Sequence, residues 1–141
     1  MIKVIKSFPP NYSQIVETLG DVSKSLPVFA YGEYIYNPFD REITKDVEEH
    51  EAVHLAQQAK FTSPDIWYSS YLTDKGFRLQ QEIEAYGWQY AFGKERVKNN
   101  KLRDAFLDSL AVELSGEAYG KLLSFGEARI KINKYAKVCY D

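Results

Sequence analysis

Two histidines and a glutamate fall within five consecutive residues, His50-Glu51-Ala52-Val53-His54. On an α-helix, residues four apart lie on one face, so both imidazoles can reach a single metal ion. Glu51 lies about 100° around the helix from His50, so its carboxylate can flank the metal without binding it. Two neutral nitrogen ligands, and a carboxylate that takes a proton from a metal-activated water, are the groups that a zinc hydrolase needs.

The chain contains no other histidine. Two randomly placed histidines would fall four apart with a glutamate directly after the first in about one sequence in a thousand of this length. The sequence therefore predicts a zinc site with one Zn²⁺ per chain. The alternative interpretation is a helix that carries two solvated or hydrogen-bonded histidines.

A third ligand is expected because catalytic zinc usually has three protein ligands and one open position. The only cysteine, Cys139, is remote in sequence, so we expect a carboxylate, and Glu82 and Glu84 are the candidates. Both lie on a predicted helix over residues 77–92. Glu82 lies about 70° from the centre of the apolar stripe of this helix and Glu84 about 130°. Glu82 is therefore the predicted ligand, and Glu84 is predicted to face water. The stripe consists of Leu79, Ile83, Tyr86 and Tyr90.

The N-terminal third supplies the predicted strands. Residues 2–8 alternate apolar and polar side chains before two prolines, and residues 28–36 are rich in β-formers, with Gly32 marking a bulge or a hairpin. Between them, residues 11–19 predict a short helix that ends at Gly20. We interpret the aromatic side chains of residues 28–36 as a sheet face. In the functional alternative, one strand forms an edge above the metal helix, where an extended peptide could add.

The predicted metal helix begins at Thr44 or Asp46 and runs to about residue 60. Ala52, Val53 and Ala56 lie opposite the histidines, which predicts a helix buried on its apolar back with its polar side facing a cleft.

Further helices are predicted from a cap at residues 62–65, from an apolar spacing over 102–114, and from a capping box at 124–127. Gly93 is predicted to end the helix that carries Glu82, and the charged residues 94–101 are predicted to be solvated. A loop over residues 116–120 carries Tyr119. Because a tyrosine hydroxyl can donate to a developing oxyanion, Tyr119 is a catalytic candidate beside Glu51.

Composition fits one α+β domain over residues 1–141, a small sheet packed on the metal helix and several further helices. Hydrophobic residues make up 45% and aromatic residues 15%, which excludes a disordered chain. The net charge of −2 lacks the excess of positive charge that binding to nucleic acid or to an anionic membrane requires. No apolar run is long enough for a signal peptide or a membrane span, and one cysteine favours a reducing compartment. We therefore expect a cytoplasmic protein.

The motifs also resemble a known family. His50 to His54, followed by Glu82-Ile83-Glu84-Ala85 on a later helix, looks like the gluzincin pattern H-E-x-x-H then E-x-x-A. More closely, the chain from about 2 to 132 resembles a family of small phage-encoded zinc metallopeptidases. The matching stretches are 34–38, 50–54, 71–74, 77–79 with Glu82, and parts of 114–125.

The resemblance implies a minimal zincin-like fold, with His50, His54 and Glu82 as ligands and Glu51 as general base. It also implies a peptide or protein substrate in the cytoplasm of a host cell. Two features depart from the pattern: Tyr86 stands where many gluzincins place Asp or Asn, and no G-x-x-H follows. A hydrogen bond to a ligand histidine must therefore come from elsewhere.

The expected function is hydrolysis of peptide bonds by a zinc-dependent metallopeptidase. One alternative is a zincin-fold module that binds zinc without turnover, such as a phage structural or host-interaction protein. The sequence is also compatible with a metal-free inhibitor or adaptor, and with a non-peptide hydrolase such as an amidase.

Overall fold

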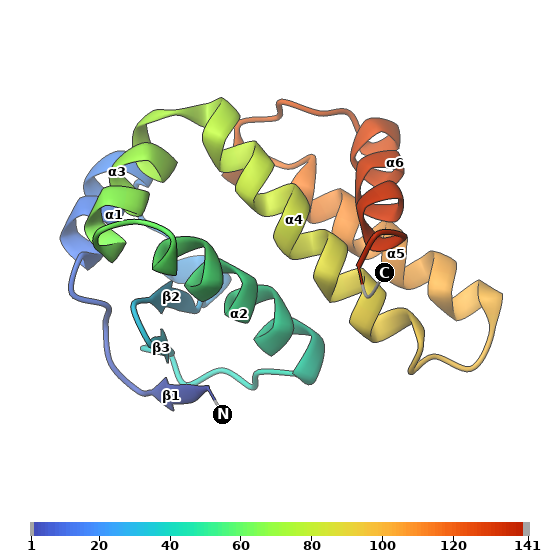
Figure 1. Ribbon diagram of the computed structural model, residues 1–141, viewed down its shortest axis with the longest axis horizontal. Helices are drawn as coiled ribbons and strands as arrows, with labels where there is room; N and C mark the ends of the chain where they lie inside the picture. The colour runs from blue at the N-terminus through green and yellow to red at the C-terminus, as the bar shows by residue number, and fades with distance from the viewer. Residues whose placement is uncertain (1, 140–141) are drawn as a thin grey trace.

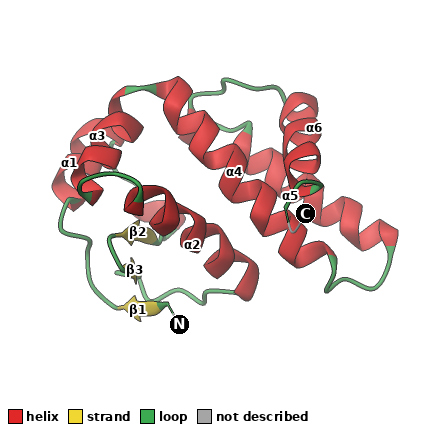
Figure 2. Cartoon of the chain, in the orientation of Figure 1, coloured by secondary structure: helices red, strands yellow, loops and turns green. Residues whose placement is uncertain are grey.

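A small three-stranded sheet and six α-helices make up residues 2–139, the part of the chain that the computed structural model describes (Figures 1 and 2). The predicted α+β class is confirmed. The sheet lies entirely in the N-terminal third, and every element after it is helical. Figure 1 shows α1, α3 and the sheet on one side, α4, α5 and α6 on the other, and α2 between them.

The sheet has the order β1-β3-β2, from strands β1 (Lys3–Ile5), β2 (Phe29–Tyr31) and β3 (Tyr34–Tyr36). β1 is parallel to β3, and β2 is antiparallel to it. β2 and β3 form a hairpin whose turn contains Gly32 at φ 66°, in the left-handed region that glycine favours. The hairpin interpretation of Gly32 is thus confirmed, and the strands are shorter than the sequence pattern indicates.

A first hydrophobic cluster joins the sheet to two helices. Helix α1 (Tyr12–Leu19) ends at Gly20, as predicted, and α3 (Pro64–Thr73) begins where the side chain of Ser63 accepts a hydrogen bond from the Ile66 N–H. The two helices contact each other. The buried members of this cluster are Ile15, Phe29, Trp67, Tyr68 and Leu72.

A second hydrophobic cluster lies among α4 (Lys75–Lys94), α5 (Asn100–Leu114) and α6 (Phe125–Ala136). The predicted capping box is present, between Ser124 and Glu127. The predicted helix end at Gly93 is wrong, because α4 continues through it. A Cβ at Gly93 would lie 2.4 Å from the Phe106 ring, so the glycine lets α5 approach α4 closely.

Helix α2 (Lys45–Ala59) lies between the two clusters and packs against β2, α3 and α4. The predicted burial of its apolar back is wrong, since Ala56 is exposed and Ala52 and Val53 are only half-buried. Its polar side is buried and faces a cleft, as predicted. Hydrogen bonds and ion pairs to neighbouring elements compensate the burial of these polar groups. The buried residues of α2 are His50, Glu51, His54, Gln57 and Gln58.

Strand β2 is an edge strand and faces α2, the position that a peptide-binding strand would need. Part of its free edge is already occupied. The Ala30 C=O accepts hydrogen bonds from Gln58 Nε2 at 2.8 Å and from the Tyr68 hydroxyl at 2.6 Å. The Gly32 N–H donates to Gln58 Oε1 at 2.8 Å. An added peptide would have to displace Gln58 at this end of the strand.

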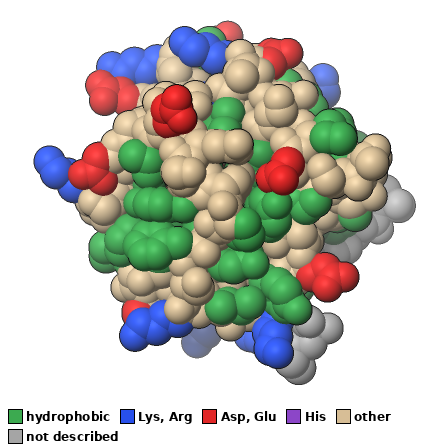
Figure 3. All heavy atoms as spheres, turned by 90° about the vertical axis from the view of Figure 1, so that its left-hand side faces the viewer, with side chains coloured by type: hydrophobic (Ala, Val, Ile, Leu, Met, Phe, Trp, Pro, Cys, Tyr) green, Lys and Arg blue, Asp and Glu red, His purple; other side chains and the backbone are tan. Residues whose placement is uncertain are grey.

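The face of the molecule over α1 and α3 carries apolar side chains in patches, with charged groups around them, and neither histidine is visible there (Figure 3). Leu19 on α1 and Ile66 on α3 are exposed. Among the helices of residues 2–139, none combines the length and the apolar character that crossing a membrane requires.

Candidate metal centre

Helical spacing brings His50, Glu51 and His54 to the interior side of α2. All three are buried, with 8%, 8% and 6% of their surfaces exposed. One potential ligand atom from each lies within 4.8 Å of the others. The group could therefore hold a metal ion, and its two nitrogens and one carboxylate match the donors that divalent transition metals bind.

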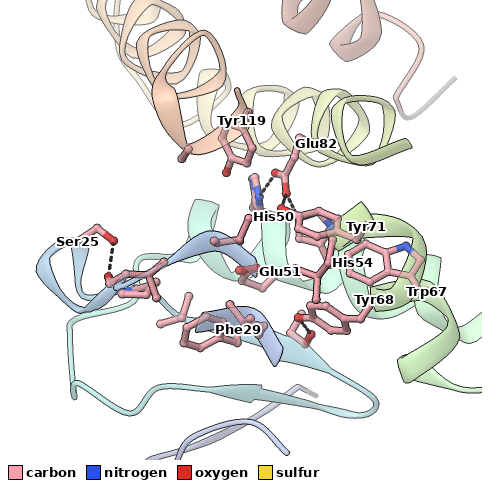
Figure 4. Close-up of a pocket in the computed structure, with 18 residues that line it drawn as sticks. Ser25, Phe29, His50, Glu51, His54, Trp67, Tyr68, Tyr71, Glu82 and Tyr119 are labelled. Carbon is pink, nitrogen blue, oxygen red and sulfur yellow. Dashed lines mark hydrogen bonds and ion pairs between the residues drawn. The ribbon is translucent and has the colours of Figure 1, made fainter. Parts of the chain in front are cut away.

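Glu82 projects from α4 onto the same two histidines (Figure 4). Its Oε1 lies 3.1 Å from His50 Nε2, and its Oε2 lies 3.1 Å from His54 Nε2. Two ligand atoms at 2.0–2.1 Å from a tetrahedral zinc are about 3.3 Å apart. The spacing between Glu82 and each imidazole is thus close to that of a ligand set, and Glu82 lies where the sequence predicts the third ligand.

A glutamine fixes the ring orientation of His50. Gln89 Oε1 lies 2.9 Å from His50 Nδ1, and Gln89 Nε2 donates to Asp46 Oδ2 at 2.8 Å. Because a carboxylate only accepts, the amide must present its oxygen to the imidazole. His50 therefore carries a proton on Nδ1, and its Nε2 points towards Glu82.

His54 is held in the same way by a glutamine on its own helix. Gln57 Oε1 lies 2.8 Å from His54 Nδ1, and Gln57 Nε2 donates to Glu84 Oε1 at 2.7 Å and to the Gln81 C=O at 3.0 Å. Both partners of the Nε2 group are acceptors, so His54 also donates from Nδ1. Each histidine thus contacts an amide, and each amide contacts a carboxylate.

These contacts leave a place for positive charge between each Nε2 and Glu82. Both ring nitrogens of each histidine face an oxygen acceptor, so either a proton or a metal ion must lie at Nε2. Burial is the largest single influence on His54 and lowers its pKa, but the charge and hydrogen bond of Glu82, the charge of Glu51 and the hydrogen bond to Gln57 together raise this pKa to about 9. Burial opposes ionisation of Glu82 too, yet His54 and His50 hold the pKa of its carboxyl far below the usual range.

Glu51 differs from Glu82 in having an unpaired oxygen. Its buried Oε2 finds no hydrogen-bond partner among residues 2–139. Burial raises the pKa of Glu51, and the charges of His50 and His54 oppose that shift. An unpaired carboxylate oxygen beside two imidazoles fits a group that accepts a proton from a small molecule bound there.

Three tyrosines surround the carboxylates. The Tyr71 hydroxyl donates to Glu82 Oε2 at 2.6 Å. Tyr119, in a 3₁₀ turn (η2, Glu117–Tyr119), lies on the wall opposite Glu51, with its hydroxyl 3.1 Å from that of Tyr86 (Figure 4). Burial and the charge of Glu82 raise the pKa of Tyr119 well above its usual value, so its hydroxyl keeps its proton and can donate.

His50, Glu51 and Tyr119 line a cleft with two lobes. The first lobe has a volume of about 230 Å³ and lies inside the first hydrophobic cluster. The second has a volume of about 350 Å³ and contains polar and charged side chains. The apolar lobe is lined by Ile15, Leu19, Val22, Phe29, Trp67 and Leu72; the polar lobe is lined by Arg41, Val47, Tyr86, Gln89 and Glu113.

The cleft thus brings together all five residues that the sequence singled out, His50, Glu51, His54, Glu82 and Tyr119. The prediction that Glu84 faces water is wrong. Glu84 is half-buried and accepts hydrogen bonds from Gln57 and, at 2.9 Å, from the Tyr135 hydroxyl.

Sequence reasoning missed Gln57, Gln89, Tyr71 and Arg41. Helical spacing could have found the glutamines, since Gln57 is three residues after His54 and Gln89 is seven residues after Glu82. Gln89 also supplies a hydrogen bond to a candidate ligand histidine, which the sequence predicts to come from a position other than 86.

Comparisons of the chain with protein-family models, with curated proteins and with solved structures found no match.

Proposed function

We propose that the protein is a zinc-dependent metallopeptidase, with His50, His54 and Glu82 as ligands and Glu51 as general base. One observation carries the proposal: the Nε2 atom of each imidazole faces an oxygen of the Glu82 carboxylate, where positive charge is required, and Glu51 beside them keeps a buried oxygen unpaired. A purely structural ion-pair cluster would have no use for an unpaired carboxylate next to it.

The roles of the residues follow from their contacts. Zinc in this position would polarise a substrate carbonyl and acidify a water molecule. Glu51 takes a proton from the attacking water and passes it to the leaving nitrogen as the C–N bond breaks. The Tyr119 hydroxyl, on leaving its contact with the Tyr86 hydroxyl, donates to the oxygen on which negative charge develops. Gln57 and Gln89 hold the imidazoles in the tautomer that leaves Nε2 free for the metal.

The first test is metal content, in protein purified without chelators. Wild type should hold about one zinc per chain and Glu82→Gln much less, because two histidines alone make a weak site. Glu84→Gln is the matched control, since Glu84 contacts the site only through Gln57, and it should keep its zinc. Wild type that stays free of metal after zinc is added back would refute the proposal.

The second test separates metal binding from turnover. Glu51→Gln should hold zinc as wild type does and cleave a peptide library at least about a hundredfold more slowly, because it lacks the proton acceptor. Equal cleavage by the two proteins would show that Glu51 is not the base.

A protein that binds zinc without turnover is the second candidate. The edge of β2 favours it, because Gln58 already occupies part of the edge to which an extended peptide substrate would add. Full zinc content together with no cleavage of any library peptide would support this candidate.

A further inference from the structure

Beyond the candidate metal site, whose residues all line the first lobe, the two lobes of the cleft differ in polarity. The apolar lobe is formed by the hydrophobic cluster of α1, β2 and α3. The polar lobe lies on the other side of Glu51 and contains one cation, Arg41, as well as the carboxylate of Glu113. A substrate that spans both lobes would therefore meet an apolar surface on one side and charged groups on the other.

Arg41 is held in place through its backbone. The buried side chain of Asn37 accepts a hydrogen bond from the Arg41 N–H at 3.1 Å and donates to the Arg41 C=O at 2.9 Å. The preceding residue, Asp40, has φ 52° and completes the turn. Both polar backbone groups of Arg41 are thus occupied, and this fixes the point from which the side chain enters the lobe.

The guanidinium of Arg41 has N–H donors that remain available to bind a ligand. It makes no ion pair with any residue that the structure describes, and its one hydrogen bond is a long contact of 3.4 Å from Nε to the Glu42 C=O. The carboxylate of Glu113, in the same lobe, already accepts from the Tyr86 hydroxyl at 3.1 Å. An unpaired guanidinium in a cleft is suited to bidentate binding of a carboxylate.

We propose that Arg41 binds a carboxylate of the substrate, so that the cleft selects peptides with a free C-terminus or an acidic side chain close to the scissile bond. The inference rests on the proposed function. A lobe of about 350 Å³ is about 7 Å across, the length of about two extended residues. The carboxylate therefore lies within about two residues of the bond that is cleaved, and the apolar lobe takes a hydrophobic side chain on the other side.

Binding, rather than turnover, is the direct test. Four acetylated tripeptides that begin with phenylalanine are titrated into Glu51→Gln protein by calorimetry, both zinc-saturated and chelator-treated. The first pair is Phe-Ala-Ala as the free acid and as the amide. The second pair is Phe-Asp-Ala amide and Phe-Asn-Ala amide. The first pair tests a terminal carboxylate and the second an acidic side chain. Each pair of peptides is then titrated into two double variants, in which Glu51→Gln is combined with Arg41→Gln or with Arg96→Gln. The Arg96→Gln change is the control, because it removes a guanidinium outside the cleft.

We expect at least one carboxylate peptide to bind about tenfold or more tightly than its uncharged partner. Arg41→Gln should abolish that difference and Arg96→Gln should preserve it. Equal binding within both pairs would overturn the inference. So would a preference that survives Arg41→Gln, since the carboxylate would then bind elsewhere, for example to zinc. These outcomes do not depend on turnover. Carboxylate binding can therefore fail while the peptidase proposal stands, and it can hold while the peptidase proposal fails.

Discussion

Each histidine of the site has an oxygen acceptor on both sides of its ring, a glutamine amide at Nδ1 and Glu82 at Nε2. The amides matter because they are neutral. They orient the rings through a hydrogen bond without adding charge, while the nearest full negative charges behind the histidines, on Asp46 and Glu84, lie one side chain further away. Among residues 2–139, Glu82 is therefore the one carboxylate that forms an ion pair with both imidazoles.

Removal of one amide should weaken metal binding. Gln57→Leu deletes the acceptor at His54 Nδ1, and loss of such a contact typically costs about 10–100-fold in metal affinity. Competition titration with a zinc-binding dye would measure the change. Gln80→Leu, at an exposed position of α4, is the control and should bind zinc as wild type does. Unchanged affinity of Gln57→Leu would show that the amide does not orient the ring.

The affinity for zinc should depend on pH because His54 must lose a proton to bind the metal. Its pKa of about 9 in the metal-free protein means that zinc must displace a proton at neutral pH. Zinc affinity should rise by up to about tenfold per pH unit and level off near pH 9. The stability of the metal-free protein should change in the opposite direction and fall as the pH rises. The raised pKa stabilises the fold fully below 6.5, the ordinary value, and this contribution is lost as the pH rises through about 9.

Both trends can be measured on one preparation, by zinc titration and by urea unfolding between pH 6 and pH 9.5. A zinc affinity that is constant from pH 6.5 to pH 8.5 would contradict displacement of the His54 proton.

At the scale of the elements, α4 connects the site to the helical half of the molecule. It carries Glu82 and Gln89 towards α2, while glycines let its neighbours approach. At Gly87 a Cβ would lie 2.6 Å from the Tyr135 ring and 2.9 Å from Tyr135 Cβ, an atom that the backbone of α6 holds in place. The distance between α4 and α6 therefore depends on the absence of a side chain at this position.

Gly87→Ala should destabilise the protein, by about 1–3 kcal/mol, because overpacking outweighs the better helix propensity of alanine. Gly126→Ala is the matched control: a Cβ there meets nothing within 4 Å, in the first turn of α6. It should leave stability unchanged or raise it by roughly 0.5–1 kcal/mol. Urea unfolding would compare the two variants. An equal gain in both would contradict close packing at Gly87.

Most elements could be predicted from the sequence because their signals are local. Gly20 ends α1, Ser63 and Pro64 open α3, and the Ser124 capping box opens α6, each within a few residues. Glu82 was also predictable, since it borders the apolar stripe that α4 buries. The strands were harder to bound, because Pro9 lies four residues after the end of β1 and alternation overestimated the length between.

The full burial of the polar side of α2 could not be predicted, because polar residues are buried only where they have partners and these partners are distant in sequence. The partners of His50 and Gln58 lie 39 and 28 residues away, in Gln89 and Ala30. Glu84 was predicted to be solvent-exposed for the same reason, because its partner Tyr135 is 51 residues away in the sequence. Gly93 was misread because a glycine that admits a neighbouring helix looks the same in sequence as one that ends its own.

At the scale of the whole molecule, the candidate metal centre lies between two hydrophobic clusters. α1, β2 and α3 form one cluster, and α4, α5 and α6 form the other. His50 and His54 come from α2, which packs on both halves, and Glu82 comes from the second half. A bound metal would therefore link elements that otherwise meet through a largely polar interface.

Removal of metal should weaken that link. Zinc at a hundred times its dissociation constant should raise the free energy of unfolding by about 2.7 kcal/mol, and a chelator should reverse the gain. Hydrogen exchange should quicken most at the buried turns of α2, where the ligands lie. Glu82→Gln is the control and should respond little to either treatment. Equal stability of wild type with and without zinc would contradict a metal that bridges the halves.

The side chain of Gln58 has a consequence for the solubility of the protein. By donating to the Ala30 C=O and accepting from the Gly32 N–H, it imitates the backbone of a fourth strand. Unpaired strand edges are templates on which copies of a chain stack into aggregates. Gln58 occupies part of this template from inside the molecule, so one amide of the helix that carries both histidines blocks the addition of a further strand at the Ala30–Gly32 end of β2.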